Sequence, residues 1–290
     1  MKQLKEYIKE GLFDDLDKIE KIGGMESNVK QLKKEIIDWI ENNNRINIHK
    51  TKLKFDFSTT PATVNYDGDI YFKYDITSLT NDLFQWGKVS KDFKCSGTNI
   101  TSLKNAPKKV GGDFICSWCD SLTSLGGSPE EVGSMFDCSH CDSLTSLEGS
   151  PKEVDGRFDC SYCEKLKSIK DAPKKVGWSF DCDGCKSLES LEGAPKEIKM
   201  NFDCGRCISL KSLKGAPKVV GEYFYCHNCK SLTSLKGAPE KVGGFNCNGC
   251  DSLKSLEGAP KEVRKDFSCG NKFTIDDVRT VSNVKGKIFC

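Results

Sequence analysis

The composition of this 290-residue chain excludes several classes of protein before any motif is considered. Its 44 Lys and Arg residues nearly balance 42 Asp and Glu residues, which gives a net charge of +2. Binding to a phosphate backbone needs several clustered cations, so we do not expect nucleic acid as a partner. No apolar run approaches the roughly 18 residues of a membrane-spanning helix, so we expect no membrane span.

Two stretches at the amino-terminal end have the spacing of amphipathic helices. Apolar residues recur every three or four positions over residues 1–22 and over residues 26–43, with Gly23-Gly24 between them. From Ile46 to Trp86 the pattern changes to alternation, as in KLKFDF and DIYFKY around Asp67-Gly68. This predicts a helical segment over 1–43 and a β-hairpin-rich cap over 44–92.

From residue 93 to residue 269 the chain repeats one pattern every 22 residues, with two steps of 21. Each repeat contains Phe-x-Cys, two apolar residues three positions apart, a proline and a Val or Ile. The first cysteines of the repeats are Cys95, Cys116, Cys138, Cys160, Cys182, Cys204, Cys226, Cys247 and Cys269. This period is typical of a solenoid, in which each coil buries its apolar side only against its neighbours.

The residue types within one repeat predict extended backbone. Phe180 and Cys182 lie two residues apart and share the inner face of a strand, which leaves Asp181 pointing outward. The Ala-Pro and Ser-Pro dipeptides exclude a continuing helix. We therefore predict a mainly β fold, a parallel β solenoid of about nine coils. Residues 270–290 form a predicted C-terminal cap, with a short helix at 276–282 and a closing strand at 287–290.

The repeats resemble a known family. Val176, Phe180, Cys182, Cys185 and Leu188 follow the leucine-rich repeat pattern L-x-x-L-x-L-x-x-(N/C)-x-L, with one extra residue before the last leucine. The stretches GCKSLESLEGAPKEI and HCDSLTSLEGSPKEV resemble the bacterial surface-antigen type and the short-repeat type of secreted effectors. The resemblance implies a leucine-rich-repeat-like solenoid and leaves function open, because that scaffold binds unrelated partners.

The 17 cysteines have three interpretations. They are small buried residues, or zinc or iron-sulfur ligands in C-x-x-C pairs, or disulfides. We favour packing, because in-register side chains about 4.8 Å apart point in parallel and suit neither a closed tetrahedron nor a relaxed disulfide. We expect no metal and no cofactor. The second cysteines are Cys119, Cys141, Cys163, Cys185, Cys207, Cys229 and Cys250, at the bend where the resembled family often carries an asparagine ladder. The odd total, with no secretory signal peptide, favours a reducing compartment.

The outward positions of the strands are the candidate binding site, because packing explains the inward ones. One outward column contains four consecutive aspartates, a row of like charges that is locally unfavourable unless it is neutralised. Arg157 lies in the preceding outward column, two residues before Asp159, and can relieve part of the repulsion within the row. The candidate partner-binding residues are Asp137, Asp159, Asp181, Asp203, Arg157, Tyr223, Tyr225 and Trp178. An acidic strip bordered by aromatics suits a basic protein surface; the alternative is that Asp recurs by repeat duplication and is simply solvated.

Catalysis has little support in the sequence. His140 and His227 lie between cysteines of C-x-x-C pairs, and we interpret them as variable bend residues. No P-loop, Gly-rich dinucleotide turn or His-Glu-x-x-His is present. We predict no catalytic residues and a protein that is not an enzyme, with a thiol hydrolase as a third possibility.

The opening MKQLKEYIKEGLFDD carries a second resemblance. It is similar to the capsid-targeting peptides of internal head proteins in T-even-like bacteriophages, which a prohead protease cuts after a glutamate. The resemblance implies a targeting peptide over residues 1–10, with Ile8 and Glu10 in the recognition positions and Gly11 after the cut. The alternative is a helix that packs on the cap or mediates self-association.

The resulting hypothesis is a non-enzymatic protein-binding solenoid of phage origin. It acts in the host cytoplasm or rides in the virion, and it binds a host or virion protein through the exposed side of its sheet. The alternative is a zinc-binding or thiol redox-sensing protein that uses the C-x-x-C columns. Partner identity and oligomeric state do not follow from the sequence.

Overall fold

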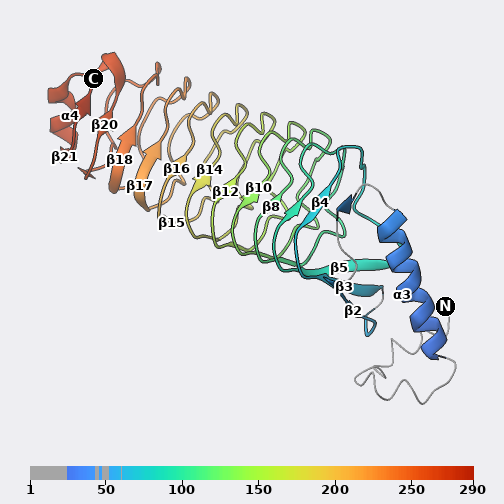
Figure 1. Ribbon diagram of the computed structural model, residues 1–290. Coiled ribbons are helices and arrows are strands. Elements are labelled where there is room, and N and C mark those ends of the chain that lie inside the picture. Colours follow the sequence, from blue (N-terminus) through green and yellow to red (C-terminus); the bar gives the residue numbers. More distant parts are fainter. Residues whose placement is uncertain (1–24, 43–45, 48–51, 60) are drawn as a thin grey trace.

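A computed structural model describes residues 25–42, 46–47, 52–59 and 61–290. Its coils stack into an elongated tower, with an N-terminal helix at one end and a C-terminal helix at the other (Figure 1). The fold is a mainly β, parallel solenoid of about ten turns, which confirms the predicted fold class. The predicted helix over 1–22, and with it Ile8, Glu10 and Gly11, lies outside the described residues.

Each coil contributes one strand to each of two rows. We call the row that carries the Phe-x-Cys segments the front row and the other the back row. The front row contains β4 (Ile70–Phe72), β6 (Phe93–Lys94), β8 (Phe114–Ile115), β10 (Phe136–Asp137), β12 (Phe158–Asp159), β14 (Phe180–Asp181), β16 (Phe202–Asp203), β20 (Phe267–Ser268) and β22 (Ile288–Phe289). The back row contains β3 (Ala62–Tyr66), β5 (Phe84–Val89), β7 (Lys109–Val110), β9 (Glu131–Val132), β11 (Glu153–Val154), β13 (Lys175–Val176), β15 (Glu197–Ile198), β19 (Glu262–Val263) and β21 (Asn283–Val284). β17 (Val219–Tyr225) and β18 (Lys241–Asn246) run through both rows.

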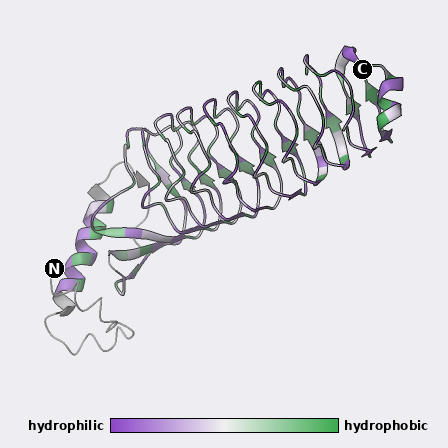
Figure 2. Ribbon diagram, turned by 180° about the vertical axis from the view of Figure 1, so that it is seen from behind, coloured by the Kyte–Doolittle hydropathy of each residue, from purple (hydrophilic) through white to green (hydrophobic). Residues whose placement is uncertain are grey.

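Stacked phenylalanines form the centre of the core. Phe158, Phe180 and Phe202 occupy the same position on neighbouring parallel strands. Their ring centroids lie 5.2 and 5.4 Å apart, and all three side chains are fully buried. The two apolar columns that follow are buried beside them, as at Leu188 and Leu191. The hydrophobic strands of successive coils consequently line up along the tower (Figure 2). Because each ring packs against the coils above and below, stacking supplies the burial that one coil lacks.

The helix α3 (Met25–Asn42) closes the amino-terminal end of this core. Ile36 and Ile40 are buried, and the Trp39 ring meets the Phe84 ring edge to face, 5.4 Å between centroids. The apolar spacing over residues 26–43 therefore predicted both the helix and the face that it buries. No helix in the described part of the chain has the length and apolar character needed to cross a membrane.

The strand pairing next to α3 differs from the expected hairpin around Asp67-Gly68. The hairpin lies earlier, where β2 (Leu53–Asp56) pairs antiparallel with β3. β3 pairs in parallel with β5, and β4 pairs in parallel with β6 while β1 (Ile46–Asn47) flanks β4 antiparallel. Asp67-Gly68 is thus the corner between the two rows of the first coil, and parallel coil pairing begins before residue 93. Alternation predicts a strand but not its neighbour, which explains the difference.

The carboxyl-terminal segment matches its predicted elements. The helix α4 spans Ile275–Val281, and Thr274 caps it by accepting a hydrogen bond from the Asp277 amide. A short 3-10 turn, η2 (Gly270–Lys272), precedes it. β22 then pairs with β20 as the closing strand.

Candidate functional site

The four predicted aspartates lie in one line on the outer side of the front row. Asp137 is opposite Asp159, Asp159 opposite Asp181, and Asp181 opposite Asp203, with Tyr225 next in the same column. The period of the repeat was therefore sufficient to place these carboxylates together.

These carboxylates shape the bend after each front strand. Each Oδ1 accepts a hydrogen bond from the backbone N–H two residues ahead, at 2.8–3.0 Å, in the pairs Asp137–Ser139, Asp159–Ser161, Asp181–Asp183 and Asp203–Gly205. Asn246 makes the same contact with Asn248 at 3.0 Å. Such a contact is an Asx turn, which fixes a reversal of the backbone. The recurrence of Asp thus has a structural cause, and these side chains are not simply solvated: the Asp159 side chain is 9% exposed.

Arg157 links two of the aspartates, as expected from its position. Its Nη2 lies 2.8 Å from Asp159 Oδ2 and 2.5 Å from Asp181 Oδ2. Burial, reinforced by the Asp159 charge, nevertheless raises the pKa of Asp181 to about 6. Burial and the Asp181 charge raise the pKa of Asp203 to about 7. Burial and the neighbouring carboxylates therefore disfavour the charged forms of Asp181 and Asp203 even with Arg157 nearby, and an added cation would favour those charged forms.

Aromatic side chains border the strip. Tyr223 and Tyr225 stack with 5.4 Å between ring centroids, and Lys265 Nζ lies 5.4 Å from the Tyr223 ring centre. Trp178 is 60% exposed at the edge where the chain enters the front row, next to the exposed Met200. The predicted site residues thus lie on one surface, the outer side of the front row, with Trp178 at its edge.

A second line of side chains on the surface, two exposed and two half-buried, was not predicted. We call Trp118, His140, Tyr162 and Arg206 the corner ladder; each is the second residue between the two cysteines of its coil. The Trp118 and His140 rings stack at 3.8 Å, and the His140 and Tyr162 rings at 4.7 Å. The Arg206 guanidinium reaches back across the intervening coil, which carries Gly184 at this position, and lies 5.3 Å from the Tyr162 ring centre. Trp118 is 58% exposed.

The corner ladder is held in a strained backbone conformation. Its four residues have φ between 51° and 59°, and glycines take the same position in other coils, as at Gly184. Five of the six non-glycine residues with positive φ in the described part of the chain lie in this column. A left-handed conformation costs a residue with a side chain about 1–2 kcal/mol. A glycine would avoid this strain, so the side chains themselves have a use.

A buried carboxylate connects the corner ladder to the aspartate strip. Asp183 forms an ion pair with Arg206, and its Oδ1 lies 4.0 Å from His227 Nε2. The Asp183 side chain is 5% exposed. Gly205 makes this contact possible, because a Cβ there would lie 2.2 Å from His227 Cε1. Burial lowers the pKa of His227, so its ring is mainly neutral at pH 7.

His140 and His227 were interpreted as equivalent bend residues, but they occupy different columns. His140 is in the corner ladder, whereas His227 is one residue earlier in its coil and packs toward Asp183. The sequence did contain a signal for the corner ladder. The second position between the two cysteines holds Trp, His, Tyr, Gly and Arg in successive repeats.

The cysteines line the interior. Sixteen are buried and only Cys290 is exposed. Each second-column thiol donates a hydrogen bond to the carbonyl of the first-column cysteine in the preceding coil, as from Cys163 to Cys138 and from Cys185 to Cys160, both at 3.2 Å. Burial raises the pKa of Cys116 and of Cys204 well above the ordinary thiol value. Within the residues that the structure describes, no group of three or more His, Cys, Asp or Glu side chains could hold a metal ion.

The fold and its surface define a class: a parallel β solenoid with coils of about 22 residues, a stacked phenylalanine core and a polar, aromatic-edged front face. Comparison of the chain with family models, with curated proteins and with solved structures gives no match.

Proposed function

We propose that this chain is a non-enzymatic protein-binding solenoid whose partner contacts the front face. The contact surface consists of the corner ladder, the aspartate strip with Arg157, the pair Tyr223 and Tyr225, and Trp178. The observation that carries this proposal is the corner ladder, since its four side chains stand at strained backbone positions and two of them, Trp118 and Arg206, are exposed to solvent while His140 and Tyr162 are half-buried.

The chemistry of the surface suits a partner with basic side chains. Aromatic and arginine residues supply most of the energy at protein interfaces, and Trp118 and Trp178 offer large exposed rings. The carboxylates of Asp181 and Asp203, whose pKa values are raised, gain from any cation that approaches them. A lysine or arginine of the partner would relieve the like-charge row more completely than Arg157 does.

The thiol hydrogen bonds support the finer proposal that the coils are leucine-rich-repeat-like. The resembled family often places an asparagine ladder at this bend, and here the second-column cysteines bond to backbone carbonyls at that position. We further propose a phage origin, with action in the host cytoplasm or in the virion, on the resemblance of the opening peptide alone. Mass spectrometry of virions should then find a chain that begins at Gly11, and an intact Met1 terminus would contradict processing.

Site-specific photo-crosslinking tests the binding proposal. A benzophenone side chain placed at Trp118 should crosslink to one partner protein in the cytoplasm of the host, whereas the same probe at Val219, an exposed back-row position, should not. Trp118→Ala should weaken capture of that partner without lowering the melting temperature, since its side chain is 58% exposed. Equal crosslinking from both faces would contradict the proposed surface.

The zinc or thiol-redox alternative has one observation in its favour. Hydrogen bonding with Cys95 lowers the pKa of Cys119 to about 7, and hydrogen bonding with Cys226 and Cys229 lowers that of Cys250 to about 4. Both thiols are buried, which hinders a reaction with an oxidant in solution. Metal analysis of protein purified without chelator separates the two functions, because more than one zinc per chain would support the alternative and exclude a packing role.

A further inference from the structure

The column of the corner ladder extends toward the amino-terminal end of the tower. Parallel pairing of β4 with β6 and of β6 with β8 brings Tyr74, Gly97 and Trp118 to the same position in successive coils. Gly97 has the left-handed backbone of this column, with φ of 64°, but it has no side chain to join the ladder. A gap therefore separates the two rings, and we call Tyr74, Gly97 and Trp118 the aromatic slot.

Trp118 has one covered face and one open face. The His140 ring lies parallel to it at 3.8 Å and covers the face toward the next coil. Trp118 is nevertheless 58% exposed and Tyr74 is 77% exposed, and no ring contact joins these two within the described part of the chain. A Cβ on Gly97 would lie 3.1 Å from Tyr74 Cδ1, so the Tyr74 ring lies over this glycine. The open face of Trp118 therefore faces Tyr74 across the slot.

The width of the aromatic slot suits one flat group. Two strand spacings of about 4.8 Å separate the coils of Tyr74 and Trp118 by about 9.6 Å. A planar group between two rings needs about 3.5–4.0 Å on each side, which amounts to about 7–8 Å. One planar layer therefore fits between the rings, and two layers do not.

The same column contains a second gap, which the chain fills itself. Gly184 separates Tyr162 from Arg206, and the Arg206 guanidinium lies 5.3 Å from the Tyr162 ring centre. The buried carboxylate of Asp183, directly before this glycine, holds the guanidinium in an ion pair. A planar group thus occupies a gap of this kind when the charges around it are suitable.

The aromatic slot lacks the carboxylate that holds the guanidinium in the second gap. Ser96 stands directly before the glycine here, at the position that Asp183 takes there. The same coil carries Lys94 in the column of the aspartate strip, and its Nζ lies 2.8 Å from Asp92. A guanidinium in the slot would gain no buried partner and would be repelled by Lys94, so an arginine is disfavoured.

The charges beside the slot also disfavour an anion. The Lys94 ammonium is already paired with Asp92, and Lys73 and Asp75, on either side of Tyr74 in the chain, have opposite charges. A phosphate group would therefore meet carboxylates as well as ammonium groups. An uncharged aromatic ring needs no counter-charge and gains from stacking on both faces.

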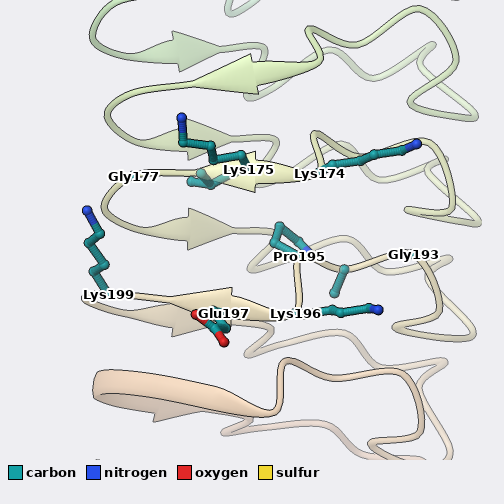
Figure 3. A pocket seen from close by; sticks show the side chains of 10 residues that line it. Lys174, Lys175, Gly177, Gly193, Pro195, Lys196, Glu197 and Lys199 are labelled. Carbon is teal, nitrogen blue, oxygen red and sulfur yellow. The ribbon is translucent and has the colours of Figure 1, made fainter.

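The opening on the back row between the unpaired strands β13 and β15 has no such arrangement of rings. Lysines, Pro195 and Glu197 line it, and its lining contains no aromatic side chain. Lys174 and Lys196 extend to one side and Lys199 to the other (Figure 3), so their ammonium groups do not converge on one ligand. The aromatic slot, on the front face, has the better-defined geometry for a ligand.

We propose that the aromatic slot binds the ring of an aromatic side chain of the partner protein, stacked between Tyr74 and Trp118. The bound ring continues the stack that Trp118, His140 and Tyr162 form along the tower. Aromatic side chains commonly anchor protein interfaces. This inference rests on the proposed protein-binding function and adds the kind of side chain that the partner inserts.

Titration of the ¹⁵N-labelled full chain with an unlabelled tripeptide, tryptophan between two glycines with both ends blocked, tests the slot by NMR. The indole N–H signal of Trp118, assigned as the one that is lost in Trp118→Phe, should shift in a saturable way. The same tripeptide with arginine in place of tryptophan, and adenosine monophosphate, should both bind more weakly. Equal or tighter binding of either would overturn the assignment to an aromatic side chain, and no saturable shift with the tryptophan peptide would overturn the slot.

Two variants locate the bound ring. Gly97→Asn keeps both rings but fills the gap, and it should abolish binding; Asn228 shows that asparagine accepts this position, with φ of 55°. Tyr74→Ala should weaken binding about threefold to tenfold, because the bound ring loses one of its two stacking partners. Phe289→Ala is the matched control, since it removes a 51% exposed ring in β22 at the other end of the tower, and it should bind as the parent does. Undiminished binding in Gly97→Asn, or equal loss in the control, would contradict the proposal.

Failure of the slot can be told apart from failure of the proposed function. A partner that crosslinks to the probe at Trp118, together with no binding of the tryptophan peptide, would overturn the slot and leave the protein-binding function standing. Binding of the peptide with no crosslinked partner would overturn the protein-binding function and leave the slot as a site for an aromatic ring.

Discussion

The front and back rows come from the same coils, but they stack different side chains inside and carry different side chains outside. The front row stacks identical phenylalanines inside and carries different side chains outside: Asp, Tyr, Trp, His and Arg. The back row stacks Val or Ile inside and carries mostly Lys and Glu outside, in pairs that cross from coil to coil. Uniformity inside each row reflects packing, so the variation among the outward side chains of the front row is what the proposed recognition depends on.

The largest expected effect comes from the shared interior. Phe180→Ala removes a ring from the middle of the phenylalanine stack and should lower the free energy of unfolding by about 3–5 kcal/mol. Trp178→Ala, two residues earlier and 60% exposed, should change it by less than about 0.5 kcal/mol. Urea denaturation of both variants measures the contrast, and similar losses would contradict the assignment of inner and outer positions.

The aspartate strip should make stability depend on pH. The pKa of Asp203 is raised to about 7 in the folded chain, so the folded state binds its proton more tightly than the unfolded state does. Stability should therefore be highest near pH 4 and fall as the pH rises through 7.

Asp203→Asn should remove much of this dependence. At 1.36 kcal/mol per pKa unit, the free energy of unfolding at pH 8 should rise by up to about 4 kcal/mol, with little change near pH 4. The Asx turn should survive, because Asn246 makes the same bond in a later coil. Unfolding measured from pH 4 to pH 8 tests this, and a parent chain that is most stable at pH 8 would contradict it.

The hydrogen bonds from the second-column thiols to backbone carbonyls should contribute less to the free energy of unfolding than the phenylalanine rings do, but by a measurable amount. Cys185→Ala leaves the Cys160 carbonyl without its donor and should lower the free energy of unfolding by about 1–3 kcal/mol. Cys185→Thr should cost less, since Thr98 fills the equivalent position in an earlier coil and its buried hydroxyl is satisfied there by donating to the carbonyl of Cys95 in the same coil, at 2.7 Å. Equal losses in the two variants, measured by urea denaturation, would show that volume alone matters at this position.

The smallest effect concerns the step between β13 and β15, the two neighbouring strands of the back row that are not paired. Lys196→Glu would place a carboxylate opposite Lys174 and should raise the free energy of unfolding by about 0.2–1 kcal/mol. Lys108→Glu, which faces Glu130, should lower it by a similar amount. Thermal unfolding at low salt measures both, and effects of the same sign would contradict the role given to charge pairing.

The sequence predicted the repeated parts of the molecule better than the singular ones. A period of 22 residues fixes which side chains stack, so the line of aspartates, the buried cysteines and the reach of Arg157 all follow from it. The first coil was misjudged because its strands alternate without the Phe-x-Cys pattern, and alternation does not reveal whether a neighbour is parallel. The corner ladder depends on backbone conformation, and the gap between β13 and β15 depends on a missing pairing; residue types alone disclose neither.

Counting reactive thiols tests the central account most directly. In the native chain a small thiol reagent should modify one cysteine, Cys290, and after unfolding it should modify all 17. Rapid modification of several cysteines in the native chain, or thiols that become reactive only when zinc is removed, would contradict coils that stack around buried, unligated sulfur.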